Sequence, residues 1–398
     1  KYNYYEYEIP LKLTPAGNYS GGNAAHQYIV WPSENMFNFP FSVLTDAKIK
    51  RNKDKQNQSN TTDATPYPDP NNQNNFITIV GNPSISNVEN IMIGIRNKNR
   101  ESVRSGEIWV NELRMSEFEE DGGWAAMANV AVGLSDIGTV NFAGRTETAG
   151  FGSIESNVTN RRMDDLYQMS FSASMDLGRF LPEIAKIQLP AYYSYTNETL
   201  SPKYNPLDED ILLDDALDAA STRQERDSIK SLTQTVATSK SFNISGAKVN
   251  IKSKKPQFYD PANITISYSQ SETDEHSAEI ESNLIKNQKA AINYSYSFNS
   301  QPWEPFKESK SMSSPMLKLI KEFHVYYLPT SLSFNTNMDR QFSQVKLRSF
   351  DTDAAAVDME QAFSNDFMWN RQFDFKYNLT RGFSLSLSTV MNANIDEG

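Results

Sequence analysis

Acidic residues gather densely enough in one stretch of the chain to suggest a cation site. Asp208-Glu209-Asp210 and Asp214-Asp215 place five carboxylates close together. Ca²⁺ takes six to eight oxygen ligands, but this stretch lacks the glycine and glutamate spacing of an EF-hand loop. We therefore interpret these carboxylates as the solvated start of a surface helix, and we predict no metal site.

Other residue types that perform chemistry are scattered along the chain or missing from it. The three histidines, His26, His276 and His324, have no second ligand at metal-binding spacing. The chain has no cysteine, which excludes disulfides, thiolate metal sites and a cysteine nucleophile. The glycines of 144–152 do not follow the strand–turn–helix order of a phosphate-binding loop. We predict that the protein is not an enzyme, has no catalytic residues and uses no cofactor.

The charge balance argues against nucleic acid as a partner. Thirty-eight lysines and arginines against 49 aspartates and glutamates give a net charge of −11, whereas phosphate neutralisation needs clustered basic residues. The basic runs Lys48-Ile49-Lys50-Arg51 and Lys252-Ser253-Lys254-Lys255 are interpreted as solvated strand ends or turns. No run of 18 apolar residues exists, so we predict no transmembrane helix, whereas the half-apolar strands of a membrane barrel stay possible.

At least seven segments alternate strictly between large apolar residues and small polar ones. In 166–177, for example, Phe171 and Met175 share one parity with other apolar residues, and Ser170 and Ser174 share the other. Successive side chains of a strand point to opposite faces. One face is therefore apolar and the other is polar but almost uncharged, which is typical of the wall of a membrane β-barrel.

We predict about nine to eleven strands of this type, each about nine to twelve residues long, which suits a tilted crossing of a hydrocarbon core. The predicted strands are 124–134, 138–152, 166–177, 187–196, 241–251, 262–271, 276–285, 289–299, 328–338, 366–377 and 383–395. The long connections are 197–240 with one or two surface helices, 300–327 with a short helix near 315–323, and the polar loop 339–365. In 241–251 the alternation slips after Ile244.

Serine, asparagine and threonine do not fill space, so the polar face favours a wide lumen that holds water or is lined by another polypeptide. The predicted lumen-facing residues are Ser170, Ser172, Ser174, Ser267, Ser295, Ser333, Ser386 and Asn392. The predicted lipid-facing residues are Phe171, Met175, Ile266, Tyr294, Phe334, Phe373, Leu385 and Leu387. Aromatic residues near strand ends suggest girdles at the lipid–water boundaries, namely Tyr192, Tyr193, Tyr195, Trp303, Tyr326, Tyr327 and Trp369.

Residues 1–120 show a different pattern, with short strands and more charge. This favours a jelly-roll-like β-sandwich domain with strands at 4–13, 41–50, 76–80, 91–95 and 107–115. Residues 51–75 are predicted to form a loop. Exposed aromatics such as Trp31 and Tyr67 could stack on sugars, but fold-level analogy does not establish function, and a structural or docking role is favoured.

Neither end of the chain reads as a natural terminus. Lys1-Tyr2-Asn3-Tyr4-Tyr5 lacks the regions of a signal peptide, and the last residues follow directly on a strand pattern. We expect a piece of a longer polypeptide. The fold class expected from the sequence is all-β, a segment of a very large antiparallel transmembrane β-barrel (121–398) plus the β-sandwich (1–120), with short helices in long loops.

An ordered series of motifs resembles the SprA/Sov family of cell-surface proteins, most specifically over 106–210 and also over 2–50. The series is Gly106-Glu107-Ile108-Trp109-Val110-Asn111-Glu112-Leu113, Gly123-Trp124-Ala125-Ala126, Gly150-Phe151-Gly152, Leu177-Gly178-Arg179-Phe180-Leu181-Pro182 and Pro202-Lys203-Tyr204-Asn205-Pro206-Leu207-Asp208. The family-motif residues are Trp109, Asn111, Glu112, Trp124, Phe151, Pro182, Tyr204, Asn205 and Pro206.

That family forms the outer-membrane translocon of the type IX secretion system of Gram-negative bacteria, which is also associated with gliding motility. The resemblance implies a single-chain barrel of about 36 strands that passes folded cargo proteins to the cell surface. It also implies several partners. These are the rest of the same barrel chain, a periplasmic plug protein, a PorV-type shuttle barrel, a periplasmic peptidyl-prolyl isomerase or Skp-like factor, secreted cargo and outer-membrane lipid.

Two other functions stay open from the sequence. One is an outer-membrane barrel that handles solutes or lipopolysaccharide, which would also show alternating strands and long loops. The other is a soluble surface adhesin built of β-sandwiches, which would be extracted without detergent.

Overall fold

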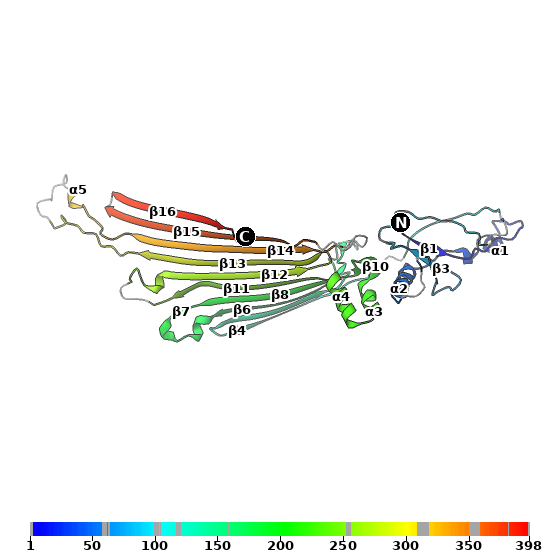
Figure 1. The fold of residues 1–398 in the computed structure, drawn as a ribbon, viewed down its shortest axis with the longest axis horizontal. Helices are drawn as coiled ribbons and strands as arrows, with labels where there is room; N and C mark the ends of the chain where they lie inside the picture. Colours follow the sequence, from blue (N-terminus) through cyan, green and yellow to red (C-terminus); the bar gives the residue numbers. More distant parts are fainter. Residues whose placement is uncertain are drawn as a thin grey trace. The chain divides into compact units, whose positions relative to one another are not determined.

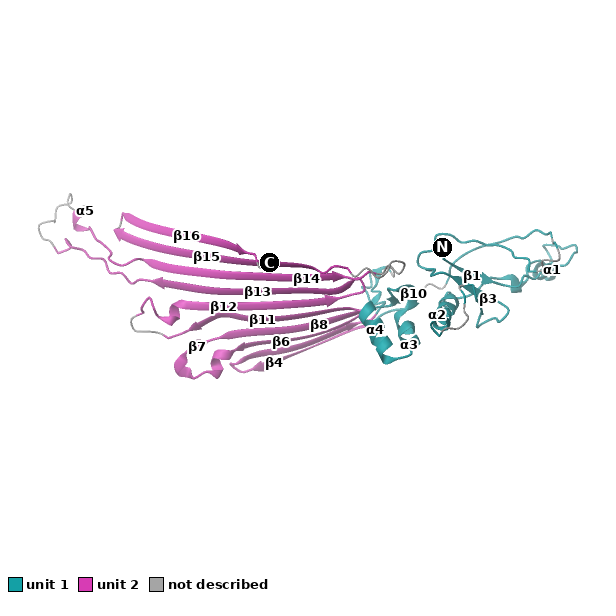
Figure 2. Cartoon of the chain, viewed as in Figure 1, with its two compact units in different colours: residues 1–123, 149–165, 201–233 teal, residues 124–148, 166–200, 234–398 magenta. Residues whose placement is uncertain are grey.

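The computed structural model describes residues 3–57, 62, 64–98, 103, 105–116, 121–155, 157, 160–251, 256–308, 318–349, 359–380 and 382–396. The chain divides into two compact units, coloured separately in Figure 2. Unit 1 comprises residues 1–123, 149–165 and 201–233, and unit 2 comprises residues 124–148, 166–200 and 234–398. The sequence places one boundary near residue 120. In the structure, unit 1 also contains the later segments 149–165 and 201–233, each of which connects two strands of unit 2 along the chain.

Unit 2 is dominated by one large antiparallel sheet (Figure 1), and the all-β expectation is confirmed. The strand order is β16-β15-β14-β13-β12-β11-β8-β6-β5-β4, with β7 paired to β11. The strands are β4 (Ala125–Leu134), β5 (Gly138–Glu147), β6 (Asp164–Asp176), β7 (Ile187–Gln188), β8 (Pro190–Pro202), β11 (Thr235–Val249), β12 (Ile264–His276), β13 (Ile280–Ser297), β14 (Ser331–Leu347), β15 (Ala362–Thr380) and β16 (Phe383–Ile395). Apart from β7, each strand pairs with the next strand of this sheet along the chain, so the sheet is a meander.

Several strands are longer than the sequence predicts. The predicted strands 276–285 and 289–299 merge largely into β13, which has 18 residues. The predicted loop 339–365 is shorter, because β14 continues to Leu347 and β15 begins at Ala362. The polar residues that suggested a loop pair with equally polar residues of β13, as Gln341 does with Asn287. Backbone ladder bonds form whatever the side-chain polarity, so the loss of apolar alternation did not end the strand.

The predicted strand 187–196 is divided at Leu189 into β7 and β8. Pro190 opens β8, a position where its missing N–H costs no ladder bond. Shorter helical turns in unit 2 are η3 (Leu177–Phe180), η4 (Glu183–Ala185), η5 (Pro261–Asn263) and α5 (Lys318–Lys321). The helix expected near 315–323 is therefore present as α5, although residues 309–317 lie outside the described part of the chain.

The slip of alternation predicted in 241–251 is a β-bulge. The register of β11 against β12 shifts between Ile244 and Ala247. Gly246 inside the bulge has a φ of 67°. This left-handed backbone is open to glycine without strain, and it is the usual conformation of a glycine bulge.

We expect Gly246→Ala to lower the free energy of unfolding of the sheet by about 1–2 kcal/mol, the cost of left-handed backbone for an L-residue. Crowding should add little, because an added Cβ would lie 3.8 Å from the Thr265 methyl group. Gly133→Ala in β4 is the matched control, since its Cβ would meet no described atom within 4 Å. Urea unfolding of the two variants and the parent protein measures both. Equal losses in the two variants would contradict the backbone explanation.

Unit 1 contains a small antiparallel sheet in the order β1-β3-β2. Its strands are β1 (Tyr4–Glu8), β2 (Pro66–Pro68) and β3 (Phe76–Val80), and the other elements of the unit are α1 (Ala24–Val30), η1 (Ser33–Asn35), α2 (Ser42–Gln56), β9 (Tyr204–Asn205), β10 (Asp208–Leu212), α3 (Leu213–Ala219) and α4 (Arg223–Thr233). Helices α3 and α4 confirm the surface helices predicted within 197–240. The hydrophobic core consists of Val43, Leu44 and Ala47 of α2 against Tyr67, Ile77 and Ile79 of the sheet.

The predicted strand 41–50 is wrong, because these residues form most of α2. The buried positions Val43, Leu44, Ala47, Lys48 and Arg51 follow helical spacing and continue past residue 50. Val43 and Ala47 fit the period of two of a strand as well as the period of a helix, so residues 41–50 by themselves suggested a strand. The predicted loop 51–75 therefore begins only after Gln56 and also contains β2.

The predicted strands 91–95 and 107–115 are also wrong, since no regular structure is assigned to these residues. The nearly continuous apolar run 91–95 predicts burial on both faces, yet Met92 is 93% exposed. Trp109 in 107–115 is 76% exposed. Their residues have high strand propensity, but a strand needs a neighbouring ladder, and none lies beside them in the described residues. Among the described residues up to 123, one sheet packs on α2 instead of on a second sheet. The predicted strand 4–13 shortens to β1, which ends before Pro10.

Candidate functional site

The strand register of unit 2 sorts its side chains into two faces. Directly opposed residues of an antiparallel ladder share a face. Ile264, Tyr294, Phe334 and Phe373 are opposed in sequence across β12, β13, β14 and β15. The adjacent row, which points the other way, contains Thr265, Asn293, Asn335 and Gln372. We call these the apolar face and the polar face.

The residues predicted to face a lumen lie together on the polar face, and those predicted to face lipid lie together on the apolar face. The strand register assigns the two faces of β11 to β16 directly. The faces of β6 are assigned through β8, because the rings of Phe171 and Tyr193 lie 6.2 Å apart and Tyr193 pairs with Phe242 of β11. The polar face holds Ser170, Ser172, Ser174, Ser267, Ser295, Ser333, Ser386 and Asn392. The apolar face holds Phe171, Met175, Ile266, Tyr294, Phe334, Phe373, Leu385 and Leu387. The medium that each face meets stays a prediction.

The apolar face is not covered by other described residues of the chain. Leu387 is 53% exposed, Ile266 is 48% exposed and Phe334 is 38% exposed. Large contiguous apolar patches are rare on soluble monomers and mark surfaces that contact a partner or a membrane. The sheet is therefore built to meet something apolar on this side.

The height of the apolar face fits a hydrocarbon layer. On β15 it runs from Phe367 to Tyr377, which is about 34 Å along a strand. A strand tilt of about 40° reduces this to a height of about 26 Å, close to the apolar band of about 25 Å on membrane barrels. β15 has 19 residues, so its further residues extend beyond the band.

One polar cluster interrupts the apolar face in the middle of β15. Trp369 Nε1 donates a hydrogen bond to Thr336 Oγ1 at 2.7 Å. The guanidinium carbon of Arg371 lies 4.1 Å from the centroid of the Trp369 rings. The Arg371 Nε is buried and has no hydrogen-bond partner. Trp369 therefore stacks on a cation in mid-strand and does not lie near a strand end as predicted, whereas its place in a girdle stays a prediction.

Other predicted girdle residues occupy mixed positions. Tyr193 and Tyr195 lie on the apolar face, whereas Tyr192 lies opposite Asn243 on the polar face. Trp303 and Tyr327 are close to each other in the connection before β14, with ring centroids 5.8 Å apart. Tyrosines that the sequence did not assign to a girdle also fix one end of the apolar face. Their hydroxyls donate to loop carbonyls, from Tyr294 to Phe258, Tyr296 to Pro256 and Tyr377 to Tyr326.

The polar face satisfies its groups by short cross-strand contacts. Ser194 and Ser241 share a hydrogen bond of 2.7 Å. Ser388 donates to Asp374 at 2.6 Å. The ammonium of Lys289 lies 2.7 Å from a carboxylate oxygen of Asp339. These contacts link small polar groups of neighbouring strands and include one ion pair, Lys289 with Asp339.

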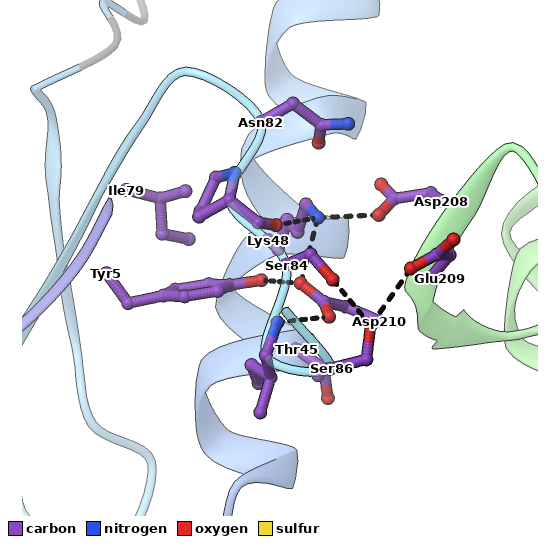
Figure 3. A network of polar contacts seen from close by, with 12 residues as sticks. Tyr5, Thr45, Lys48, Ile79, Asn82, Ser84, Ser86, Asp208, Glu209 and Asp210 are labelled. Atoms are coloured by element: carbon purple, nitrogen blue, oxygen red, sulfur yellow. Dashed lines mark hydrogen bonds and ion pairs between the residues drawn. The ribbon is translucent and has the colours of Figure 1, made fainter. Parts of the chain in front are cut away.

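A second feature is a buried ion cluster inside unit 1, shown in Figure 3. Lys48 of α2 is fully buried. Its Nζ donates to Asp208 Oδ1 at 2.5 Å, to Asp210 Oδ2 at 3.1 Å and to the carbonyl of Pro83 at 2.7 Å. An ammonium has three N–H donors, so these three acceptors satisfy it completely.

Asp210 connects this cluster to the N-terminal strand. Its Oδ2 accepts a hydrogen bond from the Tyr5 hydroxyl at 2.6 Å, and its Oδ1 accepts one from the Ile85 amide at 2.6 Å. Ser86 donates to Glu209 at 2.9 Å in the same place. The cluster thus fastens β10, a segment far along the chain, to β1 and α2.

These contacts correct two sequence interpretations. Asp208-Glu209-Asp210 opens β10 and not a helix, and Asp210 is buried. The run Lys48-Ile49-Lys50-Arg51 lies within α2, with Lys48 and Arg51 buried, so it is not a solvated strand end. The helical stripe that continues from Leu44 to Lys48 could have shown that Lys48 points inward. The other basic run, 252–255, lies outside the described residues.

The predicted sugar-stacking surface is not supported at Tyr67, which is buried at 6% exposure and donates its hydroxyl hydrogen to Asp54. Trp31 is 54% exposed at the end of α1. Among the described residues, no group of three or more histidines, aspartates or glutamates is placed to hold a metal ion. No helix in that part of the chain is long and apolar enough to span a membrane.

A comparison with protein-family models decides the family. The model SprA_N, described as "Motility related/secretion protein", matches residues 1–217, which is 217 of the 398 residues and so more than half. The chain belongs to the SprA_N family. None of the curated proteins with which the chain was compared matches it. Membership makes this a motility- and secretion-related protein of the cell envelope, as the resemblance in its motifs led us to expect.

The family-motif residues of this SprA_N chain are spread over turns, strand starts and one irregular segment. Asn205 of β9 is buried and accepts a hydrogen bond from the Leu207 amide at 3.0 Å, which forms a tight turn before β10. The Trp124 amide, just before β4, donates to Thr148 Oγ1 at 2.9 Å. In the irregular segment, the Trp109 indole donates to Glu107, Asn111 follows, and Glu112 has a φ of 53°. The Phe151 carbonyl accepts a hydrogen bond from the Arg162 amide, and Pro182 precedes η4. Tyr204 lies in β9, and Pro206 is exposed. Their positions indicate roles in chain geometry, because they do not converge on one site.

Tyr5 makes the stability of unit 1 depend on pH. Burial, followed by the hydrogen bond to Asp210, raises the pKa of Tyr5 well above its usual range. Because the folded pKa exceeds the unfolded one, this tyrosine contributes stability that is complete below pH about 10 and is lost as the pH rises. We expect the free energy of unfolding of unit 1 to fall by about 1.4 kcal/mol per pH unit above pH 10 through Tyr5.

Tyr5→Phe should remove that share of the pH dependence. The measurement is urea unfolding of unit 1 in the complete protein at a series of pH values, for the parent and the variant. Tyr5→Phe lowers stability at neutral pH by the lost hydrogen bond, so the slope against pH is the informative quantity. The same slope in both proteins would show that Tyr5 is not the titrating group.

Proposed function

We propose that this chain is part of the wall of an outer-membrane protein-conducting pore, the translocon of the type IX secretion system, which exports folded cargo proteins to the cell surface. The observation that supports this most strongly is the two-faced sheet of unit 2. Its exposed apolar face has the height of a hydrocarbon layer, and its opposite face consists mostly of small polar residues. Family membership supports a secretion role independently of the sheet.

The polar face favours a wide conduit over a selective channel. A selective channel places rings of charge at a constriction, whereas here Lys289 is paired with Asp339 and the positions beside this pair on β13 and β14 are asparagine, alanine and glutamine. Small neutral side chains keep a lumen open and give a folded protein few attachment points. The pore would therefore accept cargo by size and not by charge.

The sheet needs further strands to close. Its strand order ends at β4 on one side and at β16 on the other. Unpaired edge groups cannot be left in hydrocarbon, so a membrane sheet must be closed or capped. We propose that the rest of the same polypeptide supplies the remaining strands. A periplasmic plug protein and a PorV-type shuttle barrel would close the wide lumen or its lateral opening, and a periplasmic peptidyl-prolyl isomerase or Skp-like factor would assist.

The sequence has no cysteine in this segment, which allows a direct test with single cysteines in the membrane-embedded complete protein. Ser295 and Tyr294 are adjacent in β13 and lie on opposite faces. We expect a probe on Tyr294→Cys to be quenched by brominated lipid, and Ser295→Cys to react with a membrane-impermeant thiol reagent. Ser333 and Phe334 form a second such pair in β14. Equal water access at both members of each pair would reject the membrane wall and favour the soluble adhesin.

Secretion itself distinguishes the translocon from a solute or lipopolysaccharide transporter. Deletion of the full-length protein should leave cargo proteins trapped in the periplasm. Normal delivery of cargo together with a defect in solute uptake or lipopolysaccharide handling would favour the transporter. The labelling pattern would be the same for both barrels, so the two experiments answer separate questions.

A further inference from the structure

Beyond one end of the apolar face, the residue type changes abruptly to cations. On β11 the apolar face runs through Ile244 and Phe242, and the next position on that face is Lys240. On β13 it runs through Ile292 and Ala290 to Gln288, and then to Lys286. Both lysines belong to a single row of the sheet, directly opposed to Glu272 on the strand between them.

One carboxylate is shared by these two ammonium groups. Glu272 Oε2 lies 3.2 Å from the Lys286 Nζ, and Glu272 Oε1 lies 3.9 Å from the Lys240 Nζ. The side chain of Lys240 is 49% exposed and that of Lys286 is 40% exposed, against 27% for Glu272. The row therefore keeps an excess positive charge with both ammonium groups open to solvent.

The neighbouring rows of the sheet show that this excess charge lies directly beside the apolar face. Arg340 lies on the same face one row nearer the apolar residues, opposite Gln288 and Phe367. The acidic residue Asp274 lies one row farther away. Going outward from the apolar face on β11 to β14, the order is thus Arg340, then Lys240 and Lys286 with Glu272 between them, then Asp274. This order matches a membrane surface, where lipid phosphates lie directly above the hydrocarbon.

We infer that Lys240 and Lys286, with Arg340 beside them, form a docking surface for the headgroup of a phosphate-bearing anionic lipid whose acyl chains lie along the apolar face. This inference rests on the proposed membrane location and deepens it, because it says which end of the apolar face prefers anionic lipid headgroups. At the other end, the hydroxyls of Tyr294, Tyr296 and Tyr377 donate to backbone carbonyls. The two boundaries therefore differ in chemistry.

Short-chain phosphatidic acid is the probe, titrated into the complete protein in a neutral detergent and measured by native mass spectrometry. Each lysine near an anionic surface is worth about 1 kcal/mol. We expect the double variant Lys240→Gln/Lys286→Gln to bind about thirtyfold more weakly, which corresponds to about 2 kcal/mol. Glu272→Gln, which removes the competing carboxylate, should bind about fivefold more tightly.

Lys289→Gln is the matched control, since Lys289 is on the same strand but faces the other way, paired with Asp339. It should leave binding unchanged. Equal weakening by Lys289→Gln, equal affinity of the parent for phosphatidylcholine, or equally tight binding of inorganic phosphate would each overturn the inference. If phosphatidic acid shows no preference while Tyr294→Cys is still quenched by lipid, this inference fails and the proposed function stands. If the apolar face is open to water, the proposed function fails.

Discussion

Replacing Lys48 by methionine is expected to lower the free energy of unfolding of unit 1 by about 3–5 kcal/mol. Asp208 and Asp210 would remain at a site from which water is excluded, with their cation removed. The side chains of Lys48 and Asp210 are each only 1% exposed. Pulse proteolysis of the complete protein in urea, with cleavage scored in residues 1–123, measures the loss.

The size of this effect depends on burial of charge and not on lysine as such. Lys53→Met removes the same charge from an exposed position of the same helix, and a change of about 0.5 kcal/mol or less is expected there. Adding Asp208→Asn and Asp210→Asn to Lys48→Met should recover part of the loss, because neutral amides are cheaper to bury than carboxylates. A loss as large in Lys53→Met, or no recovery in the triple variant, would contradict an electrostatic role for the cluster.

In the proposed membrane wall, replacing Ile292 by lysine should make folding into the membrane less favourable by about 2–4 kcal/mol, the cost of a cation near the middle of a lipid-facing strand. Ile292 lies between Ile266 and Thr336 on the apolar face and is 42% exposed. The amount of heat-modifiable, folded barrel in outer-membrane preparations gives one measurement. Unfolding in urea from lipid vesicles gives the free energy.

Ala291→Lys is the control, one residue away in β13 but on the polar face, opposite Ser267 and Asn337. We expect it to assemble like the parent, because its ammonium would lie in water. Similar losses in both variants would show that strand disruption and not lipid contact sets the cost. Tolerance of lysine at Ile292 would place this face against water or a polar partner.

Both expected losses are large compared with those of ordinary surface substitutions. Surface substitutions on a soluble protein usually change stability by about 0.5 kcal/mol or less. Ile292 is exposed by accessibility, so that rule would predict a small effect for lysine there. Only a hydrocarbon environment makes an exposed position as costly to charge as a buried one. The two experiments therefore probe different physics, a protein interior at Lys48 and a surrounding solvent at Ile292.

The sequence alone determined the two faces of the sheet in unit 2. Alternation with a period of two assigns a side chain to a face from its immediate neighbours, so Ser333 and Phe334 could be separated without knowledge of any partner strand. The bulge at Gly246 was visible for the same reason, since one extra residue shifts the parity of all that follow. Both are local properties, and the register of the structure agrees with them.

The tertiary structure alone decided where long-range partners meet. Lys48 and Asp208 are 160 residues apart in the chain, and local pattern contains nothing that brings them together. Residues 41–50 form a helix because Leu44 and Lys48 are buried on one helical stripe, which only the packing of α2 on the small sheet reveals. Residues 91–95 show the converse, because high strand propensity yields no strand without a neighbouring ladder. Faces follow from a residue's nearest neighbours, whereas pairing, burial and charge compensation depend on segments that only the folded chain brings into contact.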